Sequence, residues 1–170
     1  MTTGNGAYNN CAIWSPTCPP NPIPLGDTVI IQHNIGLVAD LDIEGVLIID
    51  SLATLSGNHE IKILPSGTVY NNGAINITDE MHVDGSLYNS GYIFANEIHS
   101  DGYICNSGTI EIWKSIDISD SIKEVIIDTK SGQISTSEII TAEKIATGQT
   151  VDVFDDSDNL NFIGQAYKRD

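Results

Sequence analysis

The residues best suited to chemistry are two glutamate–histidine pairs at equivalent places in two copies of a repeat. They are Glu80 with His82 and Glu97 with His99, and one apolar residue separates the members of each pair. Side chains alternate between the two faces of a β-strand, so both charged residues of a pair point outward when the apolar residue points inward. Two carboxylates and two imidazoles on neighbouring strands would then share one patch. Such a patch could bind a divalent metal ion or titrate near neutral pH.

The alternative is that both pairs are ordinary surface residues and that the second arose by duplication of the repeat. The chain contains no G-x-S-x-G, Walker, dinucleotide-binding or H-E-x-x-H motif. The acidic run at 155–159 lacks the glycine and the distal glutamate of a calcium loop, and it predicts a polar hairpin tip. We therefore expect no enzymatic activity and no cofactor, apart from a divalent cation at the glutamate–histidine pairs.

A short repeat positions these pairs. The pattern G-x-[VLI]-[YC]-N-[NS]-G-x-I occurs three times, and successive copies are 18 and 17 residues apart. The first glycines of the copies are Gly67, Gly85 and Gly102, and the second glycines are Gly73, Gly91 and Gly108. Helix-pair repeats and propeller blades need about 33 to 45 residues, whereas a period of 17–18 fits one coil of about three short strands. The sequence predicts an all-β, single-domain parallel β-solenoid.

The apolar residues of the repeat are expected to form inward-facing columns. The expected columns are Val69, Leu87 and Ile104; Ile75, Ile93 and Ile110; Ile63, Met81 and Ile98; and Ile77, Ala95 and Ile112. The paired glycines are expected to supply the positive φ angles at which each coil changes direction.

One polar column accompanies the apolar ones. Asn71, Asn89 and Asn106 are expected to stack as an asparagine ladder whose side-chain amides hydrogen-bond from coil to coil. In a simpler interpretation they only form turns. Their role is structural in both cases.

The N-terminal segment, residues 1–26, does not follow the repeat. Five prolines between residues 16 and 24 exclude a central strand. Because the end of a solenoid must be covered, this segment predicts a cap in which Trp14 covers the first coil.

Two of the three cysteines flank that tryptophan. A disulfide between Cys11 and Cys18 would close a short loop and would favour an oxidising compartment; two free buried thiols are the alternative. Cys105 has no assigned partner.

The regular part of the chain is predicted to span 27–149, and 150–170 to form a C-terminal hairpin and tail, because apolar and polar residues alternate on both sides of a polar turn. The chain has 170 residues and a net charge of −16 at pH 7. This acidity argues against nucleic acid as a partner, since phosphate binding needs clustered Lys and Arg. No apolar run approaches the length of a membrane span, so no membrane insertion is expected.

The opening of the chain carries a resemblance to known proteins. Trp14, Cys18 and the stretch Gly-Asp-Thr-Val-Ile-Ile-Gln-His-Asn-Ile at 26–35, followed by the repeat, resemble β-solenoid segments of secreted bacterial surface proteins such as adhesins and polysaccharide-acting proteins. The resemblance covers residues 10 to about 112. The short coils also resemble bactofilins, cytoskeletal β-helices that polymerise end to end, although the Trp/Cys/Pro opening is not part of that family's pattern. No catalytic residue carries over from either.

Three functions remain open. The first is a non-enzymatic structural or adhesive protein, secreted or on the cell surface, which binds copies of itself end to end in filaments or forms part of a stalk. The second is a carbohydrate-binding or polysaccharide-degrading module with glycans as partners. Its candidate aromatic residues are Tyr70, Tyr88, Tyr92 and Tyr103. The third is a bactofilin-like cytoskeletal scaffold.

Overall fold

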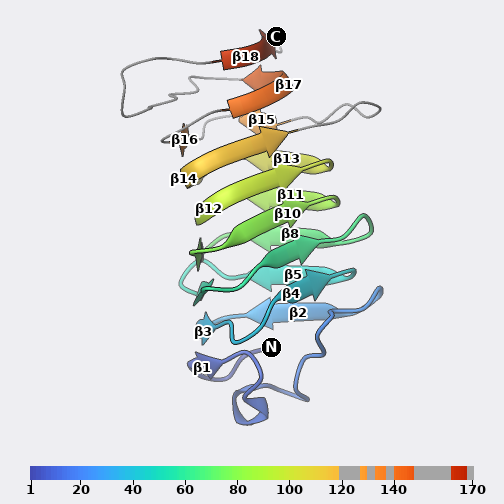
Figure 1. Ribbon diagram of the computed structural model, residues 1–170. Helices are drawn as coiled ribbons and strands as arrows, with labels where there is room; N and C mark the ends of the chain where they lie inside the picture. The colour runs from blue at the N-terminus through green and yellow to red at the C-terminus, as the bar shows by residue number, and fades with distance from the viewer. Residues whose placement is uncertain (119–126, 130–132, 137–139, 148–161, 168–170) are drawn as a thin grey trace.

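The computed structural model is a single stack of parallel strands wound into a β-solenoid, with β1 and β18 at opposite ends (Figure 1). It describes the backbone of residues 1–118, 127–129, 133–136, 140–147 and 162–167, and the side chains of residues 1–112. The parallel β-solenoid predicted from the repeat is therefore confirmed. The hairpin expected over 150–162 lies almost wholly outside the described residues.

Each coil contributes strands to three faces. The first face contains β2 (Thr28–Ile31), β5 (Val46–Ile49), β8 (Thr68–Asn71), β11 (Ser86–Asn89), β13 (Tyr103–Asn106) and β15 (Ile127–Thr129). The second contains β1 (Gly6–Ala7), β3 (Asn34–Gly36), β6 (Thr54–Gly57), β9 (Ala74–Ile77), the first halves of β12 (Tyr92–Ser100) and β14 (Thr109–Ile118), and β16 (Gln133–Thr136). The third contains β4 (Leu41–Ile43), β7 (Ile61–Ile63), β10 (Glu80–Val83) and the second halves of β12 and β14. β17 (Ile140–Thr147) pairs with both β14 and β15, and β18 (Phe162–Tyr167) pairs with β17.

The coils are of unequal length. From β8 to β11 and from β11 to β13 the register advances by 18 and 17 residues, as the repeat predicts. From β5 to β8 it advances by 22 residues, and from β14 to β16 by 24. The shortest coils arise at the corner between the second and third faces. There a two-residue gap separates β9 from β10, whereas β12 runs through the corner as one continuous strand. Its pairing with β14 shifts by one residue between Ala95 and Glu97.

Isoleucine, valine and leucine fill the interior of the stack. Each strand places alternate side chains inward, so β-branched residues, which suit extended backbone, stack directly on their counterparts one coil away. Three of the four predicted apolar columns are confirmed: those that contain Leu87, Ile93 and Ala95.

The fourth predicted column is wrong in its first member. Met81 and Ile98 pair as expected, but Met81 pairs with Ile61 and not with Ile63, which pairs with Val83. The cause is the turn after β7, which has two more residues before its glycine, Gly67, than the turn after β10 has. Counting back from the glycine therefore selected a residue two positions too late.

The asparagine column forms the predicted ladder. Asn71, Asn89 and Asn106 are in register and buried. The Asn71 Nδ2 donates to Asn89 Oδ1 over 2.7 Å, and the Asn89 Nδ2 donates to Asn106 Oδ1 over 2.8 Å. The ladder begins abruptly because Ile49 occupies the column one coil earlier. Asn71 Oδ1 is consequently a buried acceptor without a hydrogen-bond partner.

The repeat glycines are needed for a different reason from the one predicted. None of the six has a positive φ, so the expected left-handed corners are wrong. A Cβ added at Gly91 would instead overlap the carbonyl oxygen of Gly73, which accepts a hydrogen bond from Tyr92 N one coil later. The same relation holds between Gly108 and Gly91. Glycine is required because consecutive coils approach too closely at these corners for any side chain.

The N-terminal segment caps the lower end of the stack. Thr2 N donates to a carbonyl of β2, Tyr8 N donates to a carbonyl of β3, and Ile23 forms a parallel bridge with β4. Each of the three faces is thus contacted by the cap. The cap also contains a short 3-10 helix, η1 (Cys11–Ile13).

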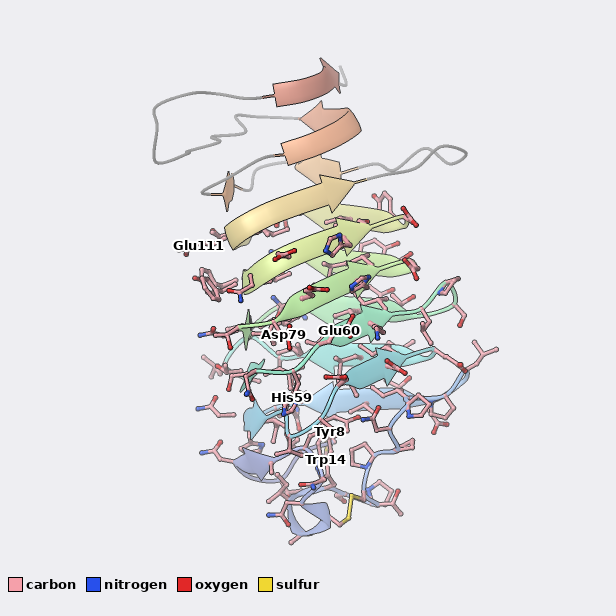
Figure 2. The ribbon with its side chains drawn as sticks, viewed as in Figure 1. Tyr8, Trp14, His59, Glu60, Asp79 and Glu111 are labelled. Atoms are coloured by element: carbon pink, nitrogen blue, oxygen red, sulfur yellow. A yellow bond between two sulfur atoms is a disulfide. The ribbon has the colours of Figure 1, made fainter. Side chains whose placement is uncertain are left out.

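An aromatic pair closes the core beneath the first coil. Tyr8 and Trp14 are buried and meet edge to face with ring centroids 5.3 Å apart. The indole Nε1 donates to the Tyr8 carbonyl over 2.9 Å, and burial raises the pKa of the Tyr8 hydroxyl. Cys11 and Cys18 are joined in a disulfide next to this pair, visible as the yellow bond near the base of Figure 2.

Candidate functional site

The glutamate–histidine pairs lie on the outside of the third face, in two charged columns. Glu80 is in register with Glu97, and His82 with His99. One coil earlier, His82 is in register with Lys62, and Lys62 with Asp42. Figure 2 labels Glu60, which precedes β7 and begins the same pattern one coil below the first pair. One column is therefore acidic, and the column beside it is mostly cationic or titratable.

Glu60 connects the two columns. Its Oε2 is 2.8 Å from Lys62 Nζ, and its Oε1 is 3.0 Å from His82 Nε2. The hydrogen bond and the charge of Glu60 raise the pKa of Lys62. The same imidazole nitrogen is 3.2 Å from Glu80 Oε2. His82 thus lies between two carboxylates that come from different coils.

The two histidines stack on one another. Their ring centroids are 4.9 Å apart and their planes are inclined by 26°. This separation matches the spacing of about 4.8 Å between hydrogen-bonded strands, so it follows from the register of β10 and β12. One ligand atom each of Glu80, His82 and His99 lies within 4.8 Å of the other two.

Glu97, the fourth predicted residue, stands slightly apart. Its Oε2 is 3.6 Å from His99 Nε2. It is not a member of the group formed by Glu80, His82 and His99. The structure therefore brings three of the four predicted residues together and places the fourth beside them.

Sequence reasoning missed Glu60 and Lys62. Both belong to Glu-Ile-Lys at 60–62, which has the same outward–inward–outward pattern as the two later pairs and is in register with the first. The signal was present but hidden by the longer turn after β7, which displaced the alignment by two residues. Aligning the copies on a glutamate followed two residues later by a basic residue or histidine, and not on glycine, would have found it.

The exposed tyrosines form a second feature, on the first face. Tyr70 and Tyr88 occupy one column and stack face to face with centroids 5.0 Å apart. Tyr103 lies against Tyr88 at 5.6 Å with its ring tilted by 59°. One ring face of Tyr70 is therefore turned toward Tyr88, although both side chains remain exposed. Tyr92, on the second face, donates from its hydroxyl to Glu111 Oε2 over 2.7 Å.

Among the described residues, no helix is long and apolar enough to cross a membrane. No protein-family model matches the chain, and comparisons with curated proteins and with solved structures find no significant match.

Proposed function

We propose that this chain is a non-enzymatic structural protein of the cell surface or extracellular space and that it forms the closed end of a rigid β-solenoid stalk. The cap is the observation that carries this proposal. Residues 1–26 satisfy backbone groups of β2, β3 and β4 and bury Tyr8 and Trp14 against the core. A solenoid end with unpaired strands would template pairing with another molecule.

The cap favours a stalk over a filament. An open-ended filament needs one end of each molecule to bind the opposite end of the next. In this chain the β1 strand at the lower end has only two residues, Gly6 and Ala7, and the irregular loop around the disulfide lies beside it. Addition of a further copy at that end would have to displace the cap. The bactofilin-like alternative, which requires stacking at both ends, is disfavoured for the same reason.

The disulfide supports an extracellular location. Cys11 and Cys18 close a loop within the cap, and disulfides persist in secreted and surface proteins but are rare in the cytosol. The glycan-binding alternative receives less support. Tyr70 and Tyr88 each turn one ring face to the other, whereas a flat sugar platform has its ring faces side by side and open to solvent.

The state of assembly tests the proposal. Light scattering and negative-stain microscopy of the full chain should show discrete, elongated particles at all concentrations. The Trp14→Ala variant should associate or polymerise, because the cap that blocks the lower end is loosened. The Leu52→Ala variant removes an exposed side chain outside the cap, so it is the matched control and should behave as the unmodified chain does. Filaments formed by the unmodified chain would refute the closed-end stalk.

A further inference from the structure

The stacked histidines and their carboxylates offer a function that does not depend on the stalk. We propose that Glu80, His82 and His99 bind a divalent transition-metal ion of the zinc class on the third face of the solenoid. All three side chains are partly exposed, and their ligand atoms already lie within 4.8 Å of one another. No backbone segment separates them, because β10 and β12 are adjacent and in register.

Small side-chain movements bring these groups to a metal. Zinc binds imidazole nitrogen and carboxylate oxygen at about 2.0–2.2 Å, so ligand atoms around one ion are roughly 3–3.5 Å apart. The separation of 3.2 Å between Glu80 Oε2 and His82 Nε2 already lies in that range, and the ligand atom of His99 lies within 4.8 Å of the other two. The two imidazoles are each 34 % exposed and sit on a surface strand, which leaves their rings free to turn toward a shared ion.

The donor set selects the class of ion. Two imidazole nitrogens and one carboxylate oxygen favour Zn²⁺, Cu²⁺ or Ni²⁺, whereas Ca²⁺ and Mg²⁺ prefer sites made of oxygen alone. The acidic column beside the histidines adds negative charge from Glu60 and Glu97, which attracts a cation to this face. Three protein ligands would leave a position for water, as in zinc sites that are not purely structural.

Glu60 holds the His82 imidazole in the metal-free chain. Its Oε1 contacts His82 Nε2, and its Oε2 contacts Lys62. Glu60 and Lys62 both belong to the coil below His82. This carboxylate orients the imidazole from one side, and Glu80 faces the same nitrogen from the other. Binding of a metal at that nitrogen requires the ring to leave Glu60, so Glu60 competes with the ion for His82 and is not one of its ligands.

A bound ion would join two coils. Glu80 and His82 belong to β10 and His99 to β12, so the complete ligand set exists only when these strands are paired in the native register. An ion that binds the folded chain and not the unfolded chain stabilises the folded state by mass action. Metal binding should therefore appear both as heat of binding and as a higher unfolding temperature.

The test is calorimetric titration of the full chain with Zn²⁺, in a Cys105→Ser background without reductant, so that the free thiol does not compete and the disulfide stays intact. We expect one ion per chain, and a melting temperature raised by at least about 3 °C at saturation. His82→Gln and His99→Gln should each weaken binding by at least about 10-fold and abolish the thermal shift, whereas Glu60→Gln should change the affinity by less than about 10-fold.

A matched control is available in the same chain. His59 is also a partly exposed histidine beside a carboxylate, 3.6 Å from Asp40, but it belongs to the preceding coil. His59→Gln should leave the affinity within about 2-fold of the parent value. Unchanged Zn²⁺ affinity in His82→Gln or in His99→Gln, equal loss in His59→Gln, or no binding at about 1 mM Zn²⁺ would each overturn the proposal. Circular dichroism of each variant verifies that the solenoid is retained.

Discussion

The asparagine ladder and the charged columns of the third face are built by the same repeat, yet they stack their residues by opposite rules. In the ladder, identical residues lie on one another because each amide carries both a donor and an acceptor. A carboxylate only accepts, so a column of glutamates cannot satisfy itself. The acidic column is instead paired sideways with Lys62 and His82. The buried amides are therefore satisfied within their own column, whereas the surface carboxylates are paired with residues of the column beside them.

Among the interior substitutions, replacement of a corner glycine should reduce the stability most. Gly91→Ala places a Cβ against the carbonyl of Gly73, which also accepts a hydrogen bond between coils, so the coils must separate. We expect a loss of about 3 kcal/mol in the free energy of unfolding, measured by chemical denaturation. Gly36→Ala is the control, because an added Cβ there meets nothing within 4 Å, and its effect should stay within about 0.5 kcal/mol. Equal effects of the two substitutions would contradict the close-approach explanation.

The ladder itself is tested by comparing its middle with its beginning. Asn89→Leu removes both amide–amide hydrogen bonds as well as those from Asn89 Nδ2 to two backbone carbonyls, and should cost about 2 kcal/mol. Asn71→Leu removes only one amide–amide bond and also removes the unpaired Asn71 Oδ1. It should therefore cost about 1 kcal/mol. Denaturation of both variants decides the order, and a larger cost for Asn71→Leu would refute the ladder account.

The charged columns of the third face can be tested by reversing one charge. Lys62→Glu turns the one lysine that these columns contain within residues 1–112 into a carboxylate beside Glu60 and Asp42. We expect a loss of stability at low ionic strength that is smaller than the loss in Asn89→Leu and that added salt reduces, because exposed charges are screened. The effect of Asn89→Leu should be nearly independent of salt. If salt changes both variants alike, the division into interior and surface rules fails.

The smallest effect concerns a single surface pair. Burial and the hydrogen bond to Glu111 raise the pKa of Tyr92 to about 12. Because the folded-state pKa lies above the unfolded value, this contribution is present below pH 10 and is lost as the pH rises toward 12. Tyr92→Phe should cost less than about 1 kcal/mol near neutral pH. The stability of this variant should fall less steeply than that of the unmodified chain as the pH rises from 10 toward 12. Denaturation as a function of pH measures it, and an unchanged profile would count against the pair.

The sequence was sufficient for the fold class and most columns, because the repeat reports directly which residues stack. Asn89 and Ile93 could be placed from spacing alone. Turn length could not be read in the same way. The two additional residues between Ile63 and Gly67 preserve both strands while changing the offset, and this concealed Glu60 and Lys62.

The role of the glycines was also beyond the sequence. The sequence does not distinguish a glycine that adopts a positive φ from a glycine that makes room for a neighbouring carbonyl. Only the distance between coils separates the two explanations, and that distance depends on residues 17 or 18 positions away in the chain. The contacts around His82 depend on the same long-range register.

The corner glycines also bear on how the gene for such a protein can change. Each of Gly73, Gly91 and Gly108 makes room for the same atom one coil away, so the coil from 85 to 101 fits above and below a copy of itself. A tandem duplication of that 17-residue unit would insert a complete coil with every column continued, and would lengthen the rod by about 4.8 Å. A duplication that is not a whole coil would shift every column out of register. The geometry thus permits growth in whole coils and opposes gradual insertion.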